Sequence, residues 1–425
     1  MVVCRVERIE VEGGERLLGE VVIHGSKNAV LPIMAAAVLN KGMTVIHNCP
    51  VIADVEYMSD ILRNIGCLVT RDGDTIAIDA YNIDNTEPKE SLFTKLRASV
   101  LLMGALLGRC GEAVIPYPGG CKIGMRPIDL HILALKTLGA DVKELDYGIS
   151  ARRIKLSGNV ITFSKRSVGA TQNAVLAAVY AEGTTIIKNA ATEPEVTSLL
   201  KCLNGMGAKI SGIGTDTVKI TGVKSLHDVV YEVESDRIVA GTYVFAAAIT
   251  GGNVALRKAP FDRMRSTVYR ALQLGCGVRQ YKDTLVIEGS TRIKPIDYVR
   301  TRTYPGFPTD MQSQLMSVLT LADGKSVIRE EIFENRFTAV KELVSMGADI
   351  RIENNTAEVT GVTALKGTTV TASDLRQGAA LVIAGLAADG KTIILNSAYI
   401  NRGYVDICKD LKGLGAKIRW LKADE

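Results

Sequence analysis

The sequence lacks a long uninterrupted apolar stretch. In its 425 residues the longest apolar run, from Ala98 to Gly108, ends at Arg109 and is too short to cross a bilayer. The opening residues, Met1 to Arg5, do not begin a secretory signal peptide, because no apolar segment follows them. We therefore expect a cytoplasmic protein that has no membrane partner.

The patterns of metal-binding and disulfide-rich proteins are missing as well. The eight cysteines show no Cys-x-x-Cys spacing and do not cluster with the four histidines; they are Cys4, Cys49, Cys67, Cys110, Cys121, Cys202, Cys276 and Cys408. This distribution indicates neither a metal site nor a disulfide framework. We expect no metal and no cofactor.

The chain also has no large excess of one charge. A formal net charge of +5 is small for 425 residues and argues against a dedicated nucleic-acid surface. It still permits a local cationic site for an anionic substrate. The hydrophobic content of 47% and the charged content of 23% are those of an ordinary globular protein, long enough for two or three domains.

What the sequence does contain is internal similarity. A phrase of the type Leu-Gly-Ala-x-Val recurs six times at a spacing of roughly 70 residues, longer than common solenoid periods. Its copies begin at Ile65, Leu138, Met206, Leu274, Met346 and Leu414. A second phrase, a glycine followed by a β-branched run, keeps step with the first and begins at Gly42, Gly183 and Gly390, with weaker copies at Gly111, Gly252 and Gly324.

Each repeat reads as a buried apolar helix, a glycine-headed strand, an amphipathic helix that ends at the Leu-Gly-Ala phrase, and a hairpin. One such hairpin joins residues 209–211 to 218–221. The buried helices are predicted at Ala29–Leu39, Ala98–Leu107, Thr171–Ala181, Val239–Ile249, Gln312–Leu321 and Gly378–Ala388. The pattern predicts an α/β protein with six repeats, three in each of two domains, and a crossing between the domains near residues 228–236.

Polar residues precede these buried helices. They are Gly25–Asn28, Lys95–Arg97, Lys165–Gly169, Asp236–Arg237, Pro308–Asp310 and Asp374–Arg376. Helix N-termini present free amides and a partial positive charge, which suit phosphate. If the six helices point into one cleft, that cleft attracts a substrate with several negative charges. For Asp236 and Asp374 an N-cap role is the alternative.

The segment Tyr117–His131 gathers reactive side chains in a glycine-rich loop. Cys121 lies between glycines and Lys122, with Arg126 five residues further on. Nearby cations favour the thiolate and raise reactivity. A buried, inert cysteine is the alternative, and the composition of the segment leaves both interpretations open.

These segments together closely resemble the UDP-N-acetylglucosamine 1-carboxyvinyltransferases, the enolpyruvyl transferases of peptidoglycan synthesis. The resemblance covers essentially the whole chain, and its carriers are Gly25–Ala29, Pro118–His131, Ser167–Thr171, Phe307–Gln312, Phe333–Phe337, Asp374–Arg376 and Arg402–Tyr404. Small departures such as Gln377-Gly378 remove no charged group from a matched motif.

The resemblance implies a two-domain inside-out α/β barrel, the enolpyruvyl transferase fold. Residues 27–234 would form an N-terminal domain that carries the Cys121 loop. Residues 1–26 and 235–425 would form a C-terminal domain, with the active site in the cleft between the two. The implied reaction moves the enolpyruvyl group of phosphoenolpyruvate to the 3'-hydroxyl of UDP-N-acetylglucosamine and releases phosphate.

Two residues have catalytic roles by this resemblance. Cys121 would protonate the methylene carbon of phosphoenolpyruvate, could form a covalent adduct with it, and would be alkylated by fosfomycin. Asp310 would accept the proton of the sugar hydroxyl; its alternative is an N-cap of the helix from Met311. Such a reaction needs a general acid, a general base and cations for the phosphate and carboxylate.

The remaining candidates bind or support. Lys27, Asn28, Arg126 and Arg402 resemble phosphoenolpyruvate ligands. The sugar-nucleotide contacts are matched by Arg97, Arg126, Pro127, Ile128, Asp129, Leu130, Lys165, Arg166, Ser167, Val168, Asp310 and Ile332. Arg336, Asp374 and Arg376 look like supporting residues, with surface charge as their alternative. His131 lies near the uracil or is a satisfied loop histidine.

Three rival functions remain. A shikimate-3-phosphate enolpyruvyl transferase shares the architecture but lacks the cysteine loop and the Pro118–His131 match. An RNA-end-processing enzyme of a similar repeat fold would need a catalytic histidine motif, and none of the four histidines stands in one. A non-catalytic sugar-nucleotide sensor would have no need of both Cys121 and Asp310.

Overall fold

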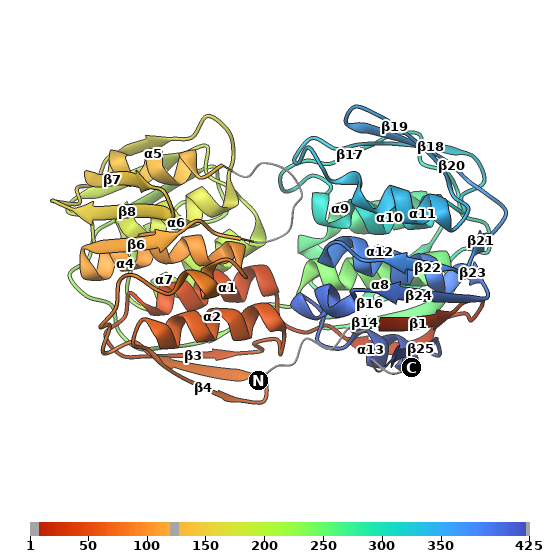
Figure 1. Cartoon of the computed structure of the whole chain (residues 1–425), viewed down its shortest axis with the longest axis horizontal. Helices are drawn as coiled ribbons and strands as arrows, with labels where there is room; N and C mark the ends of the chain where they lie inside the picture. Colours follow the sequence, from red (N-terminus) through yellow and green to blue (C-terminus); the bar gives the residue numbers. More distant parts are fainter. Residues whose placement is uncertain (1–7, 120–126, 422–425) are drawn as a thin grey trace. The chain divides into compact units, whose positions relative to one another are not determined.

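A computed structural model describes residues 8–119 and 127–421, which divide into two compact units. The N-terminal unit holds the described residues from 25 to 234, and the C-terminal unit holds residues 8–24 and 235–421. Figure 1 shows both, each with helices inside and strands outside. In the described part of the chain, no helix combines the length and the apolar character that crossing a membrane requires.

The N-terminal unit contains three small sheets, with strand orders β13-β3-β5-β4, β6-β8-β7 and β11-β12-β10-β9. Its helices are α1 (Lys27–Ala37), α2 (Ala53–Asn64), α3 (Glu90–Phe93), η1 (Arg97–Leu101), α4 (Leu102–Cys110), α5 (Asp129–Thr137), α6 (Val168–Ala178) and α7 (Pro194–Gly205). Its strands are β3 (Met43–His47), β4 (Leu68–Asp72), β5 (Thr75–Asp79), β6 (Glu112–Pro116), β7 (Ala140–Leu145), β8 (Gly148–Arg153), β9 (Val160–Thr162), β10 (Thr184–Lys188), β11 (Lys209–Ser211), β12 (Thr217–Thr221) and β13 (Val229–Glu232).

Three helices form the core of the N-terminal unit. The small apolar residues that predicted buried helices place α1, α4 and α6 there, and every residue of α6 from Ala170 to Ala178 is buried. Helices that are apolar on all sides must be covered on all sides, so the sheets and amphipathic helices such as α2 pack around them.

The predicted helix Ala98–Leu107 is interrupted. The chain forms the 3₁₀ helix η1 first and changes to α4 at Leu102. The cause is Asn173 of α6, whose Nδ2 donates to Val100 O at 3.1 Å and whose Oδ1 accepts from Gly104 N at 2.6 Å. These are the two groups that an uninterrupted α-helix pairs with each other. The amino-acid composition of residues 98–107 predicted a continuous helix, because it contains no sign of the Asn173 side chain that lies between Val100 O and Gly104 N.

The C-terminal unit contains three four-stranded sheets, β22-β24-β1-β25, β15-β16-β14-β2 and β17-β18-β20-β19, and the pair β21-β23. Its helices are α8 (Arg237–Ile249), η2 (Phe261–Arg263), α9 (Arg265–Gln273), η3 (Thr309–Met311), α10 (Gln312–Leu319), η4 (Phe337–Ala339), α11 (Val340–Ser345), α12 (Leu375–Ala387), η5 (Ser397–Arg402) and α13 (Ile407–Gly413). Its strands are β1 (Arg8–Glu12), β2 (Leu18–Val22), β14 (Asn253–Arg257), β15 (Gly277–Tyr281), β16 (Thr284–Glu288), β17 (Val299–Arg300), β18 (Lys325–Arg329), β19 (Asp349–Glu353), β20 (Thr356–Thr360), β21 (Leu365–Lys366), β22 (Thr369–Thr371), β23 (Ala388–Asp389), β24 (Lys391–Leu395) and β25 (Lys417–Leu421).

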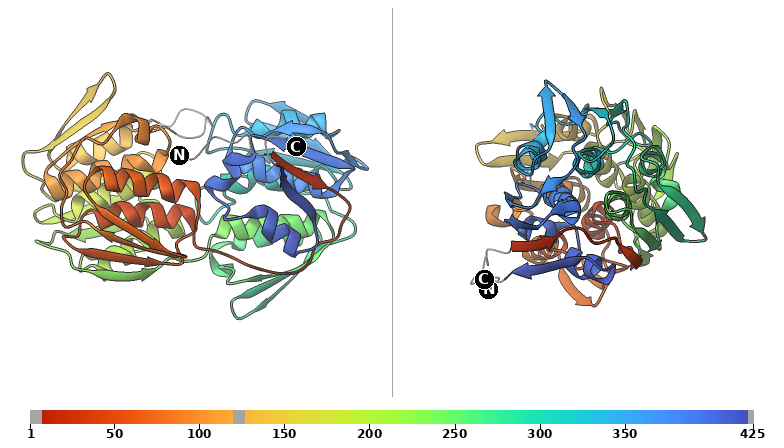
Figure 2. Two further views of the ribbon diagram at one scale, coloured as in Figure 1. Left: turned by 60° about the horizontal axis from the view of Figure 1, so that its bottom comes forward. Right: turned by 90° about the vertical axis from the view of Figure 1, so that its right-hand side faces the viewer.

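The first described strands belong to the C-terminal unit. Strand β1 lies antiparallel between β24 and β25, with Ile9 opposite Ile394 and Trp420. Figure 2 shows this red strand beside the blue C-terminal strands. Strand β2 pairs in parallel with β14. The buried helices α8, α10 and α12 pack together behind these sheets.

Two local predictions are confirmed, whereas the predicted barrel is not found among the described strands. The hairpin of β11 and β12 is confirmed, and Ile210 lies opposite Ile220. The glycines of the six Leu-Gly-Ala phrases all have φ between 94° and 104°, as expected of a glycine that directly follows a helix C-cap; they are Gly66, Gly139, Gly207, Gly275, Gly347 and Gly415. No closed barrel is found among the described strands, because each small sheet ends in edge strands that pair on one side only.

Candidate functional site

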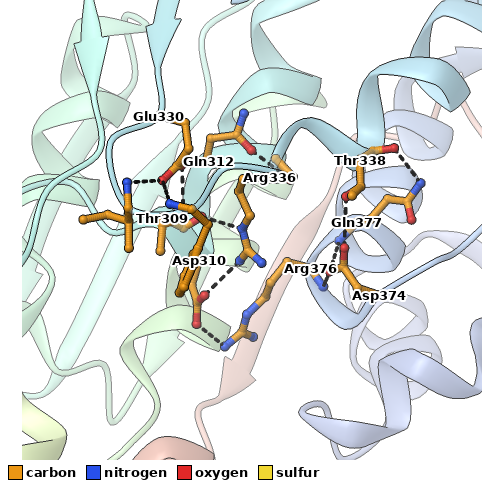
Figure 3. A network of polar contacts seen from close by, with 12 residues as sticks. Thr309, Asp310, Gln312, Glu330, Arg336, Thr338, Asp374, Arg376 and Gln377 are labelled. Carbon is orange, nitrogen blue, oxygen red and sulfur yellow. Dashed lines mark hydrogen bonds and ion pairs between the residues drawn. The ribbon is translucent and has the colours of Figure 1, made fainter. Parts of the chain in front are cut away.

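A carboxylate held by two arginines is the centre of the polar cluster in the C-terminal unit (Figure 3). Arg336 Nη2 donates to Asp310 Oδ1 at 2.9 Å, and Arg376 Nη2 donates to Asp310 Oδ2 at 2.7 Å. The side chains of both arginines are nearly buried, at 3% and 7% exposed, whereas that of Asp310 keeps 28% of its area exposed. The two buried arginines therefore hold the carboxylate in place, while part of the Asp310 side chain stays accessible to solvent.

The electrostatics of this cluster keep Asp310 ionised. Burial raises the pKa of Asp310, but the charges of Arg376, Arg336 and Arg237 outweigh burial and hold the pKa well below its usual range. Asp310 is thus a carboxylate at neutral pH. While both arginines donate to it, the carboxylate is a weak base.

Hydrogen bonds to neighbouring residues fix the positions of Asp310 and Arg336. Asp310 lies in η3, where Thr309 Oγ1 donates to Glu330 Oε2 at 3.0 Å and Thr309 O accepts from Arg336 Nε at 3.3 Å. Glu330 Oε1 also accepts from the backbone N of Ile332 at 2.8 Å. The candidates Asp310, Ile332 and Arg336 are therefore linked through Glu330 and Thr309.

The capping alternatives have different outcomes. Asp236 and Asp374 do cap helices: Asp236 Oδ1 accepts from Ile238 N and Val239 N, and Asp374 Oδ1 accepts from Arg376 N and Gln377 N. Asp310 makes no side-chain cap at α10, because its carboxylate faces the arginines. Capping by Asp374 places Arg376 at the start of α12.

Surface charge is the wrong interpretation for the three supporting residues. Arg336, Asp374 and Arg376 are 3%, 3% and 5% exposed. Asp374 Oδ2 also accepts from Thr338 Oγ1 at 3.0 Å. Buried charges persist in proteins where they are paired and hydrogen-bonded, and each of these three has such partners.

In the N-terminal unit, Lys27 forms a short ion pair that the sequence did not suggest. Its Nζ lies 2.6 Å from Asp54 Oδ2, and the two side chains are 13% and 2% exposed. Lys27 is the first residue of α1, and Asp54 lies in the first turn of α2, where a helix N-terminus favours a carboxylate. Asn28 follows Lys27 in α1 and is half-buried.

The candidate nucleotide ligands of this unit stand at helix starts. Arg97 is the first residue of η1, and residues 127–130 lead into α5. Lys165 and Arg166 precede Ser167, which caps α6 through a 3.3 Å bond from Ala170 N to its Oγ. Arg166 lies 3.8 Å from the exposed Asp216. Helices α5 and α6, and likewise η1 and α6, pack against each other.

His131 is a buried, hydrogen-bonded histidine, although it lies in α5 and not in a loop, and its place near the uracil stays a prediction. It is 5% exposed, and its Nδ1 lies 3.0 Å from Nδ2 of Asn173. Burial, followed by the charge of Arg97, lowers the pKa of His131 to about 4 against a smaller opposing effect of Asp129. The ring is therefore neutral at physiological pH.

Other candidates have simpler placements. Arg402 ends η5, a helix that packs against α12. Cys121 and Arg126 lie outside the residues that the structure describes.

Sequence reasoning missed three partners of the candidate residues. They are Asp54, which pairs with Lys27; Glu330, which accepts from Thr309 and Ile332; and Asn173, which lies beside His131. Asp54 carried a weak signal as an acid in the first turn of an amphipathic helix. Asn173 was a polar residue in an apolar run, which marks a side chain that must find partners inside the core.

Comparison with known proteins gives consistent similarities. The family model described as EPSP synthase (3-phosphoshikimate 1-carboxyvinyltransferase) matches residues 11–411. The chain is 47% identical over 412 residues to UDP-N-acetylglucosamine 1-carboxyvinyltransferase 2 of Caldanaerobacter subterraneus, covering 97% of this chain and 99% of the relative. It is 44% identical over 418 residues to UDP-N-acetylglucosamine 1-carboxyvinyltransferase of Geobacter metallireducens, covering 98% and 100%.

Solved structures agree with the described architecture. The enolpyruvyl transferase NikO from Streptomyces tendae matches with a TM-score of 0.88 and 26% identity, covering 98% of this chain and 99% of that one. EPSP synthase from Acinetobacter baumannii matches with a TM-score of 0.76 and 17% identity, covering 98% and 100%. The second likeness shows the fold alone. The mixed α/β fold is that of the solved enolpyruvyl transferases.

Proposed function

The chain belongs to the UDP-N-acetylglucosamine 1-carboxyvinyltransferases, a group of enolpyruvyl transferases, and we propose on that basis how its residues divide the reaction. The protein transfers the enolpyruvyl group of phosphoenolpyruvate to the 3'-hydroxyl of UDP-N-acetylglucosamine and releases phosphate, a step of peptidoglycan synthesis. The observation that carries this function is identity of 43–47% over nearly the full length to relatives of this one name.

The chemistry sets four requirements. The methylene carbon of phosphoenolpyruvate must gain a proton, which gives the neighbouring carbon oxocarbenium character. The sugar hydroxyl must lose its proton as it attacks that carbon. The tetrahedral adduct must then lose a proton from the methyl carbon and expel phosphate, which restores the double bond. An acid, a base and cations that hold the phosphate and carboxylate satisfy these needs.

Asp310 is the base in this proposal. Its ionised, partly exposed carboxylate is held in one orientation by Arg336 and Arg376. A general base is effective only when it is deprotonated and oriented toward the group whose proton it accepts. Lengthening of one arginine contact on substrate binding raises the basicity of Asp310 at the moment it is needed. Asp374 supports the cluster by capping the helix that carries Arg376.

Cys121 is the proposed acid, and its adduct with phosphoenolpyruvate and its alkylation by fosfomycin belong to the same proposal. The proposed phosphoenolpyruvate ligands are Lys27, Asn28, Arg126 and Arg402. Lys27 supplies a point charge, and the arginines supply bidentate forks that match phosphate and carboxylate. The buried partner Asp54 supports Lys27 because it restricts the flexible lysine stem to one direction.

The proposed sugar-nucleotide ligands are residues at the starts of η1, α5 and α6, two residues of the C-terminal unit, and Arg126, which lies outside the described residues. They are Arg97, Arg126, Pro127, Ile128, Asp129, Leu130, Lys165, Arg166, Ser167, Val168, Asp310 and Ile332. Helix starts present free amides and positive potential to a diphosphate. Their close packing in the N-terminal unit supports this proposal.

The finer organisation belongs to the same proposal. Six α/β repeats would account for the shared conformation of the six phrase glycines. Residues 27–234 would act as one domain, and residues 1–26 with 235–425 as the other. We place the reaction in the cytoplasm, where phosphoenolpyruvate is available, and expect only small-molecule substrates as partners.

Product analysis tests this function. Incubation of the purified chain with phosphoenolpyruvate and UDP-N-acetylglucosamine should yield a sugar nucleotide that has gained one enolpyruvyl group, detected by mass spectrometry. Sugar nucleotide recovered without that gain, from a folded protein, contradicts the proposal.

A further inference from the structure

Asn173 is a buried polar side chain in the middle of the apolar helix α6. It is fully buried, and its amide has partners on three other elements. Oδ1 accepts from Gly104 N of α4, while Nδ2 donates to Val100 O of η1 and lies 3.0 Å from His131 Nδ1 of α5. The two backbone partners fix which end of the amide is oxygen and which is nitrogen.

The orientation of the amide in turn fixes the form of His131. Because Asn173 Nδ2 is a donor, His131 Nδ1 must accept, so the neutral ring carries its proton on Nε2. The neutral form agrees with the lowered pKa of about 4, caused first by burial and then by Arg97. The other edge of the ring faces Gly169, where an added Cβ would lie 3.1 Å from Cε1 and Nε2.

The two glycines of this arrangement leave little room for a side chain, and Gly104 leaves none. A Cβ at Gly104 would lie 2.2 Å from Asn173 Oδ1, closer than any van der Waals contact. At Gly169, next to the start of α6, a Cβ would press on the His131 ring. The side chains of Asn173 and His131 thus fill the space where η1, α4, α5 and α6 meet.

We propose that Asn173 and His131 are positioning residues for the sugar-nucleotide substrate. Together they set the starts of η1, α5 and α6 relative to one another. Arg97 begins η1 three residues before Val100, residues 127–130 lead directly into His131, and residues 165–168 precede Gly169. This inference rests on the proposed function, in which these three segments bind UDP-N-acetylglucosamine. Both residues would act through the segments that they position.

The break between η1 and α4 shows how the amide acts. Asn173 takes up Val100 O and Gly104 N, which would otherwise pair with each other. Without the amide, that pairing restores a continuous α-helix and rotates the turn that begins at Arg97. The orientation of Arg97 thus depends on a side chain 76 positions away (173 − 97).

The experiment measures binding of UDP-N-acetylglucosamine to the full chain by calorimetry. His131→Asn keeps an acceptor near the place of Nδ1, whereas His131→Gln moves the amide toward the place of Nε2. We expect His131→Asn to bind within about threefold of the wild type, and His131→Gln and Asn173→Ala to bind about tenfold more weakly or worse. The KM for phosphoenolpyruvate at saturating sugar nucleotide should change less than about threefold.

Asn40→Ala is the matched control. Asn40 is also a buried asparagine of the N-terminal unit, 1% exposed, and its Nδ2 donates to Met43 O and Asp228 Oδ1. It follows the C-terminal end of α1, whereas the candidate ligand Lys27 begins that helix. This variant should lower the melting temperature and leave the affinity within about threefold of the wild type.

The outcomes distinguish failure of the inference from failure of the proposed function. Wild-type affinity in His131→Gln and Asn173→Ala overturns the inference, and so does equal weakening in His131→Asn and His131→Gln, since the place of the acceptor then has no effect. If Asn173→Ala does not fold, the two His131 variants decide. A wild-type chain that binds no UDP-N-acetylglucosamine contradicts the proposed function, whereas wild-type binding that the variants leave unchanged contradicts the inference alone.

Discussion

Oδ2 of Asp310 lies 2.7 Å from Nη2 of Arg376, a residue 66 positions later in the chain. With Arg336 on the other carboxylate oxygen, this contact makes Asp310 an oriented anion that keeps one accessible side. The two arginine contacts explain why Asp310 is ionised at every physiological pH and is nevertheless a weak base. The reaction proposed for this protein needs such a restrained base next to the sugar hydroxyl.

Asp310→Asn should lower kcat by about 10²–10⁴-fold, the usual contribution of a general base. The amide keeps the shape of the carboxylate but cannot accept the proton of the 3'-hydroxyl. Affinity for UDP-N-acetylglucosamine should change far less, which calorimetry checks beside steady-state kinetics. Asp323→Asn, which removes an exposed carboxylate paired with Arg292 in the same unit, is the control. Near-normal turnover in Asp310→Asn would leave Asp310 a structural role only.

Arg376→Gln should move the acid limb of the pH profile of kcat/KM to higher pH by about one unit or more. Arg376 is the largest influence that lowers the pKa of Asp310, so its removal lets that pKa rise toward its ordinary value. The fraction of ionised Asp310 then falls at a higher pH than in the wild type. Arg292→Gln, at an exposed ion pair, should leave the profile in place. An unchanged acid limb in Arg376→Gln would show that Asp310 does not control the rate.

Asp54→Asn should raise the KM for phosphoenolpyruvate by about tenfold, with a smaller effect on kcat. Without its buried partner, the Lys27 ammonium is no longer held in one direction at the start of α1. Steady-state kinetics at saturating sugar nucleotide measures the change. Asp60→Asn is the control, because Asp60 lies on the same helix in an exposed pair with Arg63. Equal KM values for Asp54→Asn and the wild type would mean that Lys27 needs no such partner.

The stability of the protein should depend on pH through His131. The folded pKa is about 4, below the ordinary value of 6.5, so folding favours the neutral ring; Arg97 and Asp129 are the charged groups that influence it. The stabilisation is fully present above pH 6.5 and is lost as the pH falls toward 4. The wild type should therefore lose about 2–3 kcal/mol more than His131→Asn between pH 7 and 4.5. Urea unfolding at both pH values measures this difference, and parallel losses in the two proteins would contradict it.

Parts of this structure follow from short-range patterns. Apolar runs predicted buried helices at six places, although α6 and α12 each begin three residues before the predicted start. The glycine of each Leu-Gly-Ala phrase predicted a left-handed residue at a helix end, because only glycine adopts that conformation at no steric cost. The capping alternative for Asp236 and Asp374 was also within reach of the sequence, since a cap depends on residues only two or three positions away.

Other parts depend on pairs that are distant in the chain. The contacts of Asp310 with Arg336 and Arg376, and that of Lys27 with Asp54, involve neighbours that no periodicity brings together. Burial of the two arginines was unexpected because isolated charges are normally on the surface. The break between η1 and α4 was unpredictable for the same reason, since its cause is a side chain of another helix.

Phosphate release from phosphoenolpyruvate by the purified wild-type chain tests the central claim most directly. The release is measured with UDP-N-acetylglucosamine, with shikimate-3-phosphate, and with neither acceptor. We expect phosphate only when UDP-N-acetylglucosamine is present, in an amount equal to the enolpyruvyl sugar nucleotide formed. Release that depends on shikimate-3-phosphate, or no release with either acceptor from folded protein, would contradict the assigned function.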